Sequence, residues 1–118
     1  MKITLLGTGS PLSDPNRAGP STLVQDEGTA LLFDCGRGVL MRLAATGVTP
    51  LTLSAVLLTH LHSDHITDLN DVITTHWIYS QAPTTLTIYG PPTTKGVVDA
   101  ILASLAHDVA YRLDHHPT

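Results

Sequence analysis

Four side chains that could bind metal ions lie within six residues of one another. His60, His62, Asp64 and His65 form the pattern His-x-His-x-Asp-His directly after an apolar run. Imidazole nitrogens and carboxylate oxygens are the ligands that zinc takes when thiolates are absent. In an extended segment His60 and His62 point to the same side, and a helix that begins near Ser63 turns Asp64 and His65 in a new direction. The spacing therefore predicts one metal ion on the first pair and a second, adjacent ion on the other pair.

The number of ligands in this segment is too small for a complete two-metal site. Two zinc ions with four ligands each need about eight ligand positions, or fewer where a water and a carboxylate bridge them. The other histidines are predicted not to be ligands, because they follow in a helix or lie near the chain's end: His76, His107, His115 and His116. We therefore expect residues 1–118 to supply only part of the site.

Apolar runs and turn signals predict the elements that position the histidine segment. Strands are expected over residues 3–6, 21–25, 30–34, 55–58 and 85–89, and helices over 37–46, 64–80 and 95–106. Residues 7–20 contain three prolines and three glycines and therefore predict a long loop. No element is expected after His107. Strands come first and then alternate with helices, which favours an α/β sheet covered by helices.

Composition indicates one domain with a substantial core. The chain has 118 residues, of which 42% are hydrophobic, and a formal net charge of −4 with only six Lys and Arg. This charge gives no general attraction to nucleic acid. Cys35 is the single cysteine and excludes an internal disulfide, so we expect a buried thiol and a cytoplasmic protein. No apolar run is long enough to span a membrane.

The segment from Thr59 to His65 resembles the signature of metallo-β-lactamase-fold hydrolases. Residues 3–10, followed by 15–17 and Ser21, resemble the opening of ribonuclease Z enzymes, and residues 32–36 resemble the first motif of the superfamily. Residues 86–91 resemble a strand and turn that ribonuclease Z proteins carry after the histidine motif. The resemblance implies an αββα sandwich, an α/β (α+β) fold, of which residues 1–118 would form roughly the first half. The family's other zinc ligands and its substrate-binding arm would come from later segments.

The resemblance also implies roles for particular residues. The site would hold two Zn²⁺ ions, and Asp64 would both bind one of them and orient or deprotonate the attacking water. Asp34 would lie beneath the metal-binding loop and hold a ligand by a hydrogen bond, with an ordinary turn aspartate as the alternative. Gly9 and Ser10 could offer backbone N–H groups to an anionic substrate, or form a plain tight turn. Arg17 could contact a phosphate, or be a solvated loop arginine.

Three functions are consistent with these features. The resemblance implies a zinc phosphodiesterase of the ribonuclease Z type, which cleaves precursor tRNA at its 3′ end and would be a homodimer at full length. The low basic charge keeps open an arylsulfatase or a cyclic-nucleotide phosphodiesterase of the same fold. The third alternative is an inactive fragment with a structural or partial metal-binding role. Half a sandwich would leave an apolar face uncovered and would therefore self-associate.

Overall fold

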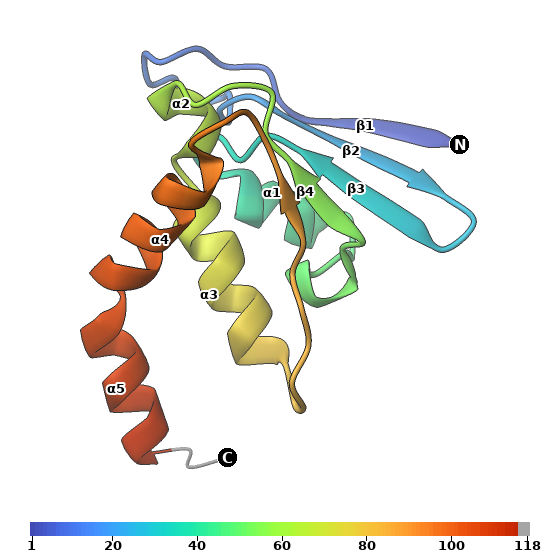
Figure 1. The fold of residues 1–118 in the computed structure, drawn as a ribbon. Helices are drawn as coiled ribbons and strands as arrows, with labels where there is room; N and C mark the ends of the chain where they lie inside the picture. The colour runs from blue at the N-terminus through green and yellow to red at the C-terminus, as the bar shows by residue number, and fades with distance from the viewer. Residues whose placement is uncertain (116–118) are drawn as a thin grey trace.

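A five-stranded sheet with helices on one face organises residues 1–115, the part of the chain that the computed structural model describes (Figure 1). The strands lie in the order of the sequence: β1 (Lys2–Gly7), β2 (Ser21–Asp26), β3 (Thr29–Phe33), β4 (Ala55–Leu57) and β5 (Ile88–Tyr89). The helices are α1 (Val39–Ala45), α2 (Ser63–Ile66), α3 (Leu69–Tyr79), α4 (Thr94–Ser104) and α5 (Ala106–His115), with a 3₁₀ turn at Pro50–Thr52. This mixed α/β architecture confirms the predicted fold class.

The sheet changes from antiparallel to parallel in its middle. β1 pairs with β2 and β2 with β3 in antiparallel register, and Asp26 lies opposite Thr29 across the predicted hairpin. β3–β4 and β4–β5 are parallel. Parallel neighbours need a crossover, and α1 and the pair α2–α3 supply these two crossovers. The predicted stop of the first helix is confirmed, because Gly47 follows the Thr46 C-cap with a φ of 84°, which favours glycine.

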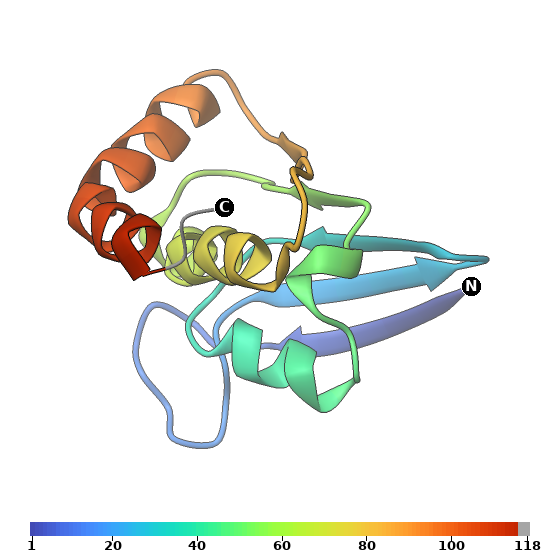
Figure 2. The same ribbon diagram turned by 90° about the horizontal axis from the view of Figure 1, so that it is seen from below.

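The core lies between the sheet and the first helices. Leu23, Leu32 and Val56 occupy neighbouring positions on the inner face of β2, β3 and β4, and all three are fully buried. They form one cluster with apolar residues of α1 and α3, namely Val39, Leu43, Leu69 and Val72. Seen from below, α1 and α3 lie across the sheet (Figure 2). Within residues 1–115 no helix has the length and hydropathy needed to cross a membrane.

The predicted helix over residues 64–80 is interrupted. α2 ends at Ile66 and α3 begins at Leu69. The Asp68 backbone N–H donates to the Cys35 carbonyl oxygen (2.9 Å), so it is not available to continue the helical ladder. The predicted start of the helix near Ser63 is confirmed, because Ser63 is the first helical residue and His62 holds the N-cap position. A contact distant in the sequence therefore overrides the local helical pattern.

Two further element predictions need correction. The strand expected over residues 85–89 is paired only at Ile88–Tyr89. The helix expected to end at residue 106 is followed directly by α5, where the structure has a helix that the prediction lacked. Asp108 and Arg112 form an i,i+4 ion pair (2.9 Å) on α5, and such pairs stabilise an exposed helix. This spacing is the sequence signal that could have predicted α5.

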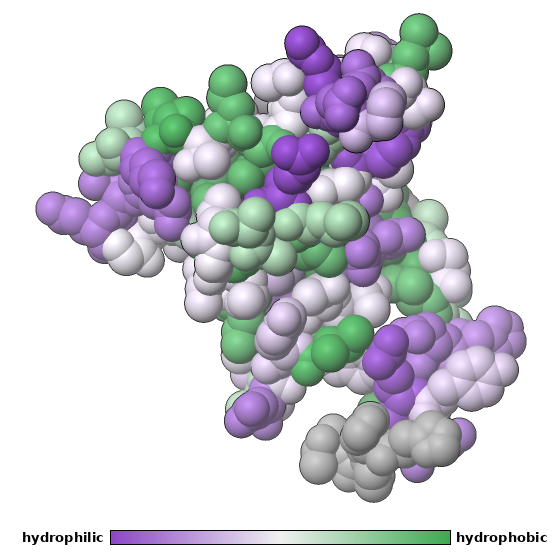
Figure 3. Space-filling view, turned by 180° about the vertical axis from the view of Figure 1, so that it is seen from behind, coloured by the Kyte–Doolittle hydropathy of each residue, from purple (hydrophilic) through white to green (hydrophobic). Residues whose placement is uncertain are grey.

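The outer face of the sheet carries exposed apolar side chains. Residues of β1 that alternate with its inward-facing positions point outward, and Ile3 and Leu5 are 60% and 66% exposed. Leu5 continues into a row across the sheet through Thr22, Phe33, Leu57 and Tyr89. Hydrophobic residues also gather at the upper left of the view from behind, over the strands (Figure 3). A contiguous apolar surface of this kind favours association.

We expect the 118-residue chain to self-associate through this face. Leu5→Lys should lower the apparent mass, because burying an unpaired ammonium group costs free energy. Met41→Lys is the matched control, since Met41 is 78% exposed on α1 and away from the sheet face. Size-exclusion chromatography with light scattering measures the effect. A wild-type chain that stays monomeric at high concentration would contradict the prediction.

Candidate metal centre

Asp34 and the histidine segment (residues 59–65) follow two strands that end at the same edge of the sheet. β3 and β4 are parallel, and Phe33 lies opposite Leu57 at their carboxyl ends. The residues that follow the two strands are therefore neighbours, and the Asp34 backbone N–H donates to the Leu57 carbonyl oxygen (2.9 Å). In open α/β sheets, ligands bind at the carboxyl ends of the strands. Asp34 has a φ of 64°, a left-handed conformation that costs on the order of 1–3 kcal/mol in a non-glycine residue.

Asp34 accepts three hydrogen bonds from the histidine segment. Its Oδ1 accepts the Thr59 backbone N–H (2.9 Å), and its Oδ2 accepts the Thr59 hydroxyl (2.8 Å). The same Oδ2 lies 2.9 Å from His65 Nδ1. Asp34 is buried, with 6% of its surface exposed. One buried carboxylate therefore joins the start of the histidine segment to its end.

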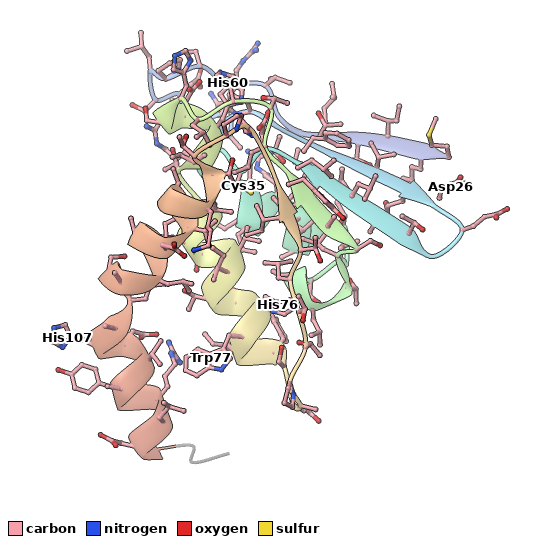
Figure 4. All side chains as sticks on the ribbon, in the orientation of Figure 1. Asp26, Cys35, His60, His76, Trp77 and His107 are labelled. Atoms are coloured by element: carbon pink, nitrogen blue, oxygen red, sulfur yellow. The ribbon has the colours of Figure 1, made fainter. Side chains whose placement is uncertain are left out.

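The structure brings the three imidazoles close together. The ring centroid of His60 lies 4.0 Å from that of His65 and 4.7 Å from that of His62. Asp64 Oδ2 lies 3.7 Å from His65 Nε2. Figure 4 shows His60 at the end of the sheet, above Cys35. In this cluster two imidazoles have Nδ1 in a hydrogen bond, His60 with Thr59 and His65 with Asp34, so their Nε2 atoms remain for a ligand.

The described residues do not by themselves form a complete metal-binding group. Across residues 1–115, no three His, Cys, Asp or Glu side chains are arranged so that they could hold one ion. The types of donor fit zinc, and the engaged Nδ1 atoms are typical of histidine ligands, which usually donate their other ring N–H to a carboxylate or carbonyl. The donor chemistry therefore fits, and the number of converging donors falls short.

The backbone of Cys35 forms hydrogen bonds with both His65 and Asp68. Its N–H donates to the His65 carbonyl oxygen (2.8 Å), and its carbonyl oxygen accepts the Asp68 N–H (2.9 Å). Asp68 Oδ2 also accepts the Leu40 N–H (3.1 Å) at the start of α1, where the Gly38 N-cap has no side chain to do so. The position of His65 is thus tied to α1 as well as to the sheet.

The thiol of Cys35 is fully buried, which confirms the prediction for this residue. Burial, with smaller contributions from the charges of Asp34 and Asp68, raises the pKa of Cys35 to about 12. The group is therefore a neutral thiol near pH 7. Because zinc binds the thiolate, Cys35 is not in the form that binds a metal ion.

The loop over residues 8–20 packs against the Cys35 turn through glycines. The Gly19 N–H donates to the Arg37 carbonyl oxygen (2.8 Å), and the Gly36 N–H donates to that of Pro20 (3.1 Å). A Cβ on Gly36 would lie 2.3 Å from the Gly19 carbonyl carbon and 2.4 Å from the Pro20 nitrogen. These contacts are backbone to backbone, so only glycine permits this packing.

The three residues predicted to contact substrate make local contacts. The Gly9 N–H donates to the Ala18 carbonyl oxygen (2.8 Å), so this N–H is not free for an anion. Ser10 Oγ accepts the Leu12 N–H (3.3 Å), and Arg17 has an exposed side chain. Within residues 1–115 no hydrogen bond joins these three residues to the histidine segment. Their roles therefore remain predictions.

His76 and His107 lie away from the cluster. Figure 4 shows His76 on α3 and His107 on α5, both well below His60. His107 was expected to follow the last helix but lies inside α5, which ends at His115. His116 falls outside the described residues. The structure thus places His76 and His107 where they cannot complete the cluster.

His76 should make stability depend on pH. It is 7% exposed, and burial lowers its pKa from the ordinary value of 6.5. The unfolded chain therefore binds more protons than the folded one as the pH falls through about 6.5, and the folded state loses stability there. We expect His76→Gln to lose less stability than the wild type between pH 7 and pH 5. Urea unfolding at several pH values measures this, and parallel curves for the two proteins would contradict it.

Two residues with evident structural roles were missed at the sequence level. Thr59 contacts both Asp34 and His60, and Asp68 holds Cys35 and the start of α1. Thr59 directly precedes the first histidine, which is the one available signal for it. The partners of Asp68 lie far away in the chain, so its sequence neighbourhood contains no signal for this role.

Comparisons with known proteins identify a family and related folds. The family described as "Anti-Pycsar protein Apyc1" matches residues 1–109. Ribonuclease Z of Mycobacterium bovis (strain BCG / Pasteur 1173P2) is 58% identical over 118 residues, which are 98% of this chain and 42% of that protein. Human tRNase Z, short form, superposes with a TM-score of 0.76 and 31% identity over 92% of this chain and 39% of its own. The metallo-β-lactamase fold protein YhfI from Bacillus subtilis superposes with a TM-score of 0.73 and 32% identity, over 83% of this chain and 39% of its own.

Proposed function

This chain belongs to the Anti-Pycsar protein Apyc1 family and has the metallo-β-lactamase fold of the ribonuclease Z branch, and we propose that it is part of a zinc-dependent hydrolase. The chain spans 42% of the length of the curated relative it matches, so the activity concerns a longer protein. In this proposal residues 1–118 are the N-terminal half of a metallo-β-lactamase-like domain. The observation that carries it is the gathering of three imidazoles and Asp64 at the carboxyl ends of β3 and β4.

His60, His62, Asp64 and His65 are the proposed ligands of two zinc ions. Zinc, when bound, supplies Lewis-acid stabilisation of charge on a phosphoryl oxygen and makes hydroxide available near neutral pH. Asp64 has only 13% of its side chain exposed and lies 3.7 Å from His65 Nε2, so it can accept a proton from the attacking water. Asp34 holds His65 by a direct hydrogen bond, which supports its proposed positioning role.

The favoured substrate is precursor tRNA, cleaved at its 3′ end. The support is the 58% identity with a protein named Ribonuclease Z and the superposition on human tRNase Z. The proposed substrate contacts are Gly9, Ser10 and Arg17. Their support is weaker: hydrogen bonds of Gly19 and Gly36 anchor the loop that contains them next to Asp34. A cytoplasmic location and a homodimer at full length complete the proposal.

A hydrolase of small phosphate or sulfate esters is the second candidate. A net charge of −4 with six Lys and Arg provides little attraction to a polyanion, which favours a small substrate. Assays of the full-length protein on precursor tRNA, an aryl sulfate and a bis-aryl phosphate separate the two candidates. Cleavage of the small esters alone would exclude the ribonuclease proposal, and cleavage of none would exclude both.

His62→Ala should abolish zinc binding and hydrolysis together in the full-length protein, because it removes one of the few imidazoles in the cluster. Zinc content by mass spectrometry and the rate of hydrolysis measure this. His107→Ala is the matched control, since His107 lies on α5 away from the cluster. A His62→Ala protein with normal zinc content would contradict the ligand assignment. A monomeric 118-residue chain with two tightly bound zinc ions would contradict the prediction that other segments supply ligands.

A further inference from the structure

We infer that Thr59 is a positioning residue that keeps the neutral His60 ring in the tautomer with its proton on Nδ1. The Thr59 hydroxyl oxygen lies 2.8 Å from Asp34 Oδ2 and 3.0 Å from His60 Nδ1, so it bridges a buried carboxylate and an imidazole. The inference adds to the proposed metal centre a residue that touches neither metal nor substrate. It rests on the proposed function only for its purpose, because the tautomer exists without metal or substrate.

The count of protons determines the direction of each hydrogen bond. A hydroxyl has one proton to donate, and a carboxylate oxygen can only accept. The Thr59 proton therefore points to Asp34 Oδ2, and the hydroxyl oxygen accepts from His60, whose Nδ1 must carry the proton. In a neutral imidazole with a proton on Nδ1, the lone pair is on Nε2. The same reasoning places the proton of His65 on Nδ1, because Asp34 Oδ2 accepts from it directly (2.9 Å).

A single carboxylate thus orients two imidazoles, one directly and one through a hydroxyl. A second hydrogen bond fixes Thr59 relative to Asp34, because the Thr59 backbone N–H also donates to Asp34 Oδ1 (2.9 Å). Removing the hydroxyl leaves this backbone bond in place and removes both the acceptor for His60 and the donor to Asp34 Oδ2. The change of tautomer should therefore fall on His60, because His65 keeps its own direct hydrogen bond to Asp34 Oδ2.

Nitrogen-15 NMR of the histidine rings in metal-free, chelator-treated protein tests the inference. The spectra are recorded near pH 8.5. In the wild type we expect His60 and His65 to carry the proton on Nδ1. Thr59→Val, which has nearly the same shape without the hydroxyl, should shift His60 toward the Nε2–H form. Thr59→Ser should restore the wild-type signals of His60.

Thr67→Val is the matched control, because the Thr67 hydroxyl donates to the Ser63 carbonyl oxygen (2.8 Å) in the adjacent helix and, within residues 1–115, forms no hydrogen bond with a histidine ring. It should leave both tautomers unchanged. A wild-type His60 with its proton on Nε2 would overturn the inference even if Thr59→Val failed to fold. An unchanged His60 tautomer in folded Thr59→Val would also overturn it. Failure of the protein to cleave any ester leaves these results intact and counts against the proposed function alone.

Discussion

Asp64→Ala is expected to lower kcat/KM for hydrolysis by about 10²–10⁴-fold in the full-length protein, because general base catalysis contributes this much. A factor of 10² corresponds to about 2.7 kcal/mol of transition-state stabilisation. The free energy of unfolding should change by at most about 1 kcal/mol, since within residues 1–115 the contact of Asp64 with an ionisable side chain is the 3.7 Å approach to His65 Nε2. The loss of rate should thus exceed the loss of stability.

Steady-state kinetics and urea unfolding of the same preparations measure the two effects. Asp71→Ala is the matched control, because Asp71 is an exposed carboxylate on α3 whose side chain bonds only weakly to Thr75 (3.5 Å). It should leave both quantities close to the wild type. Normal turnover in Asp64→Ala would show that the catalytic assignment is wrong. Equal losses in both measurements would assign Asp64 to folding instead.

Gly36→Ala is expected to destabilise the fold by at least about 1–3 kcal/mol, the usual cost of overpacking. The new Cβ would lie 2.3 Å from the Gly19 carbonyl carbon and 2.4 Å from the Pro20 nitrogen. Both atoms are backbone, so no flexible side chain can move away. The change also disturbs the turn that carries Asp34 and Cys35, and we expect it to displace His65, which accepts a hydrogen bond from Cys35.

Gly96→Ala provides a control of opposite sign. Gly96 lies inside α4, and a Cβ there would meet no atom within 4 Å. Alanine should therefore stabilise the chain by about 0.5–1 kcal/mol through its higher helix propensity. Urea unfolding of both variants measures the contrast. Equal stabilities for Gly36→Ala and the wild type would mean that the loop and the Cys35 turn do not pack closely in solution.

The sequence was sufficient for the features that depend on neighbouring residues. The candidate ligands lie within six positions, so their donor types and order are visible without a structure. β1, β2, β3 and β4 were predicted because apolar runs and turn residues mark them locally. The burial of Cys35 was expected from the residue type alone, because a free cysteine behaves as a small hydrophobic residue.

Only the tertiary structure could decide the features whose partners are distant. Asp34 and Thr59 are 25 residues apart, and Asp34 and His65 are 31 apart, yet hydrogen bonds join them. The break between α2 and α3 arises from the bond of Asp68 to Cys35, which no helical periodicity contains. Local pattern thus determined which groups are available for chemistry. The parallel pairing of β3 with β4 determined which of them meet, because it brings the carboxyl ends of two distant strands to one edge.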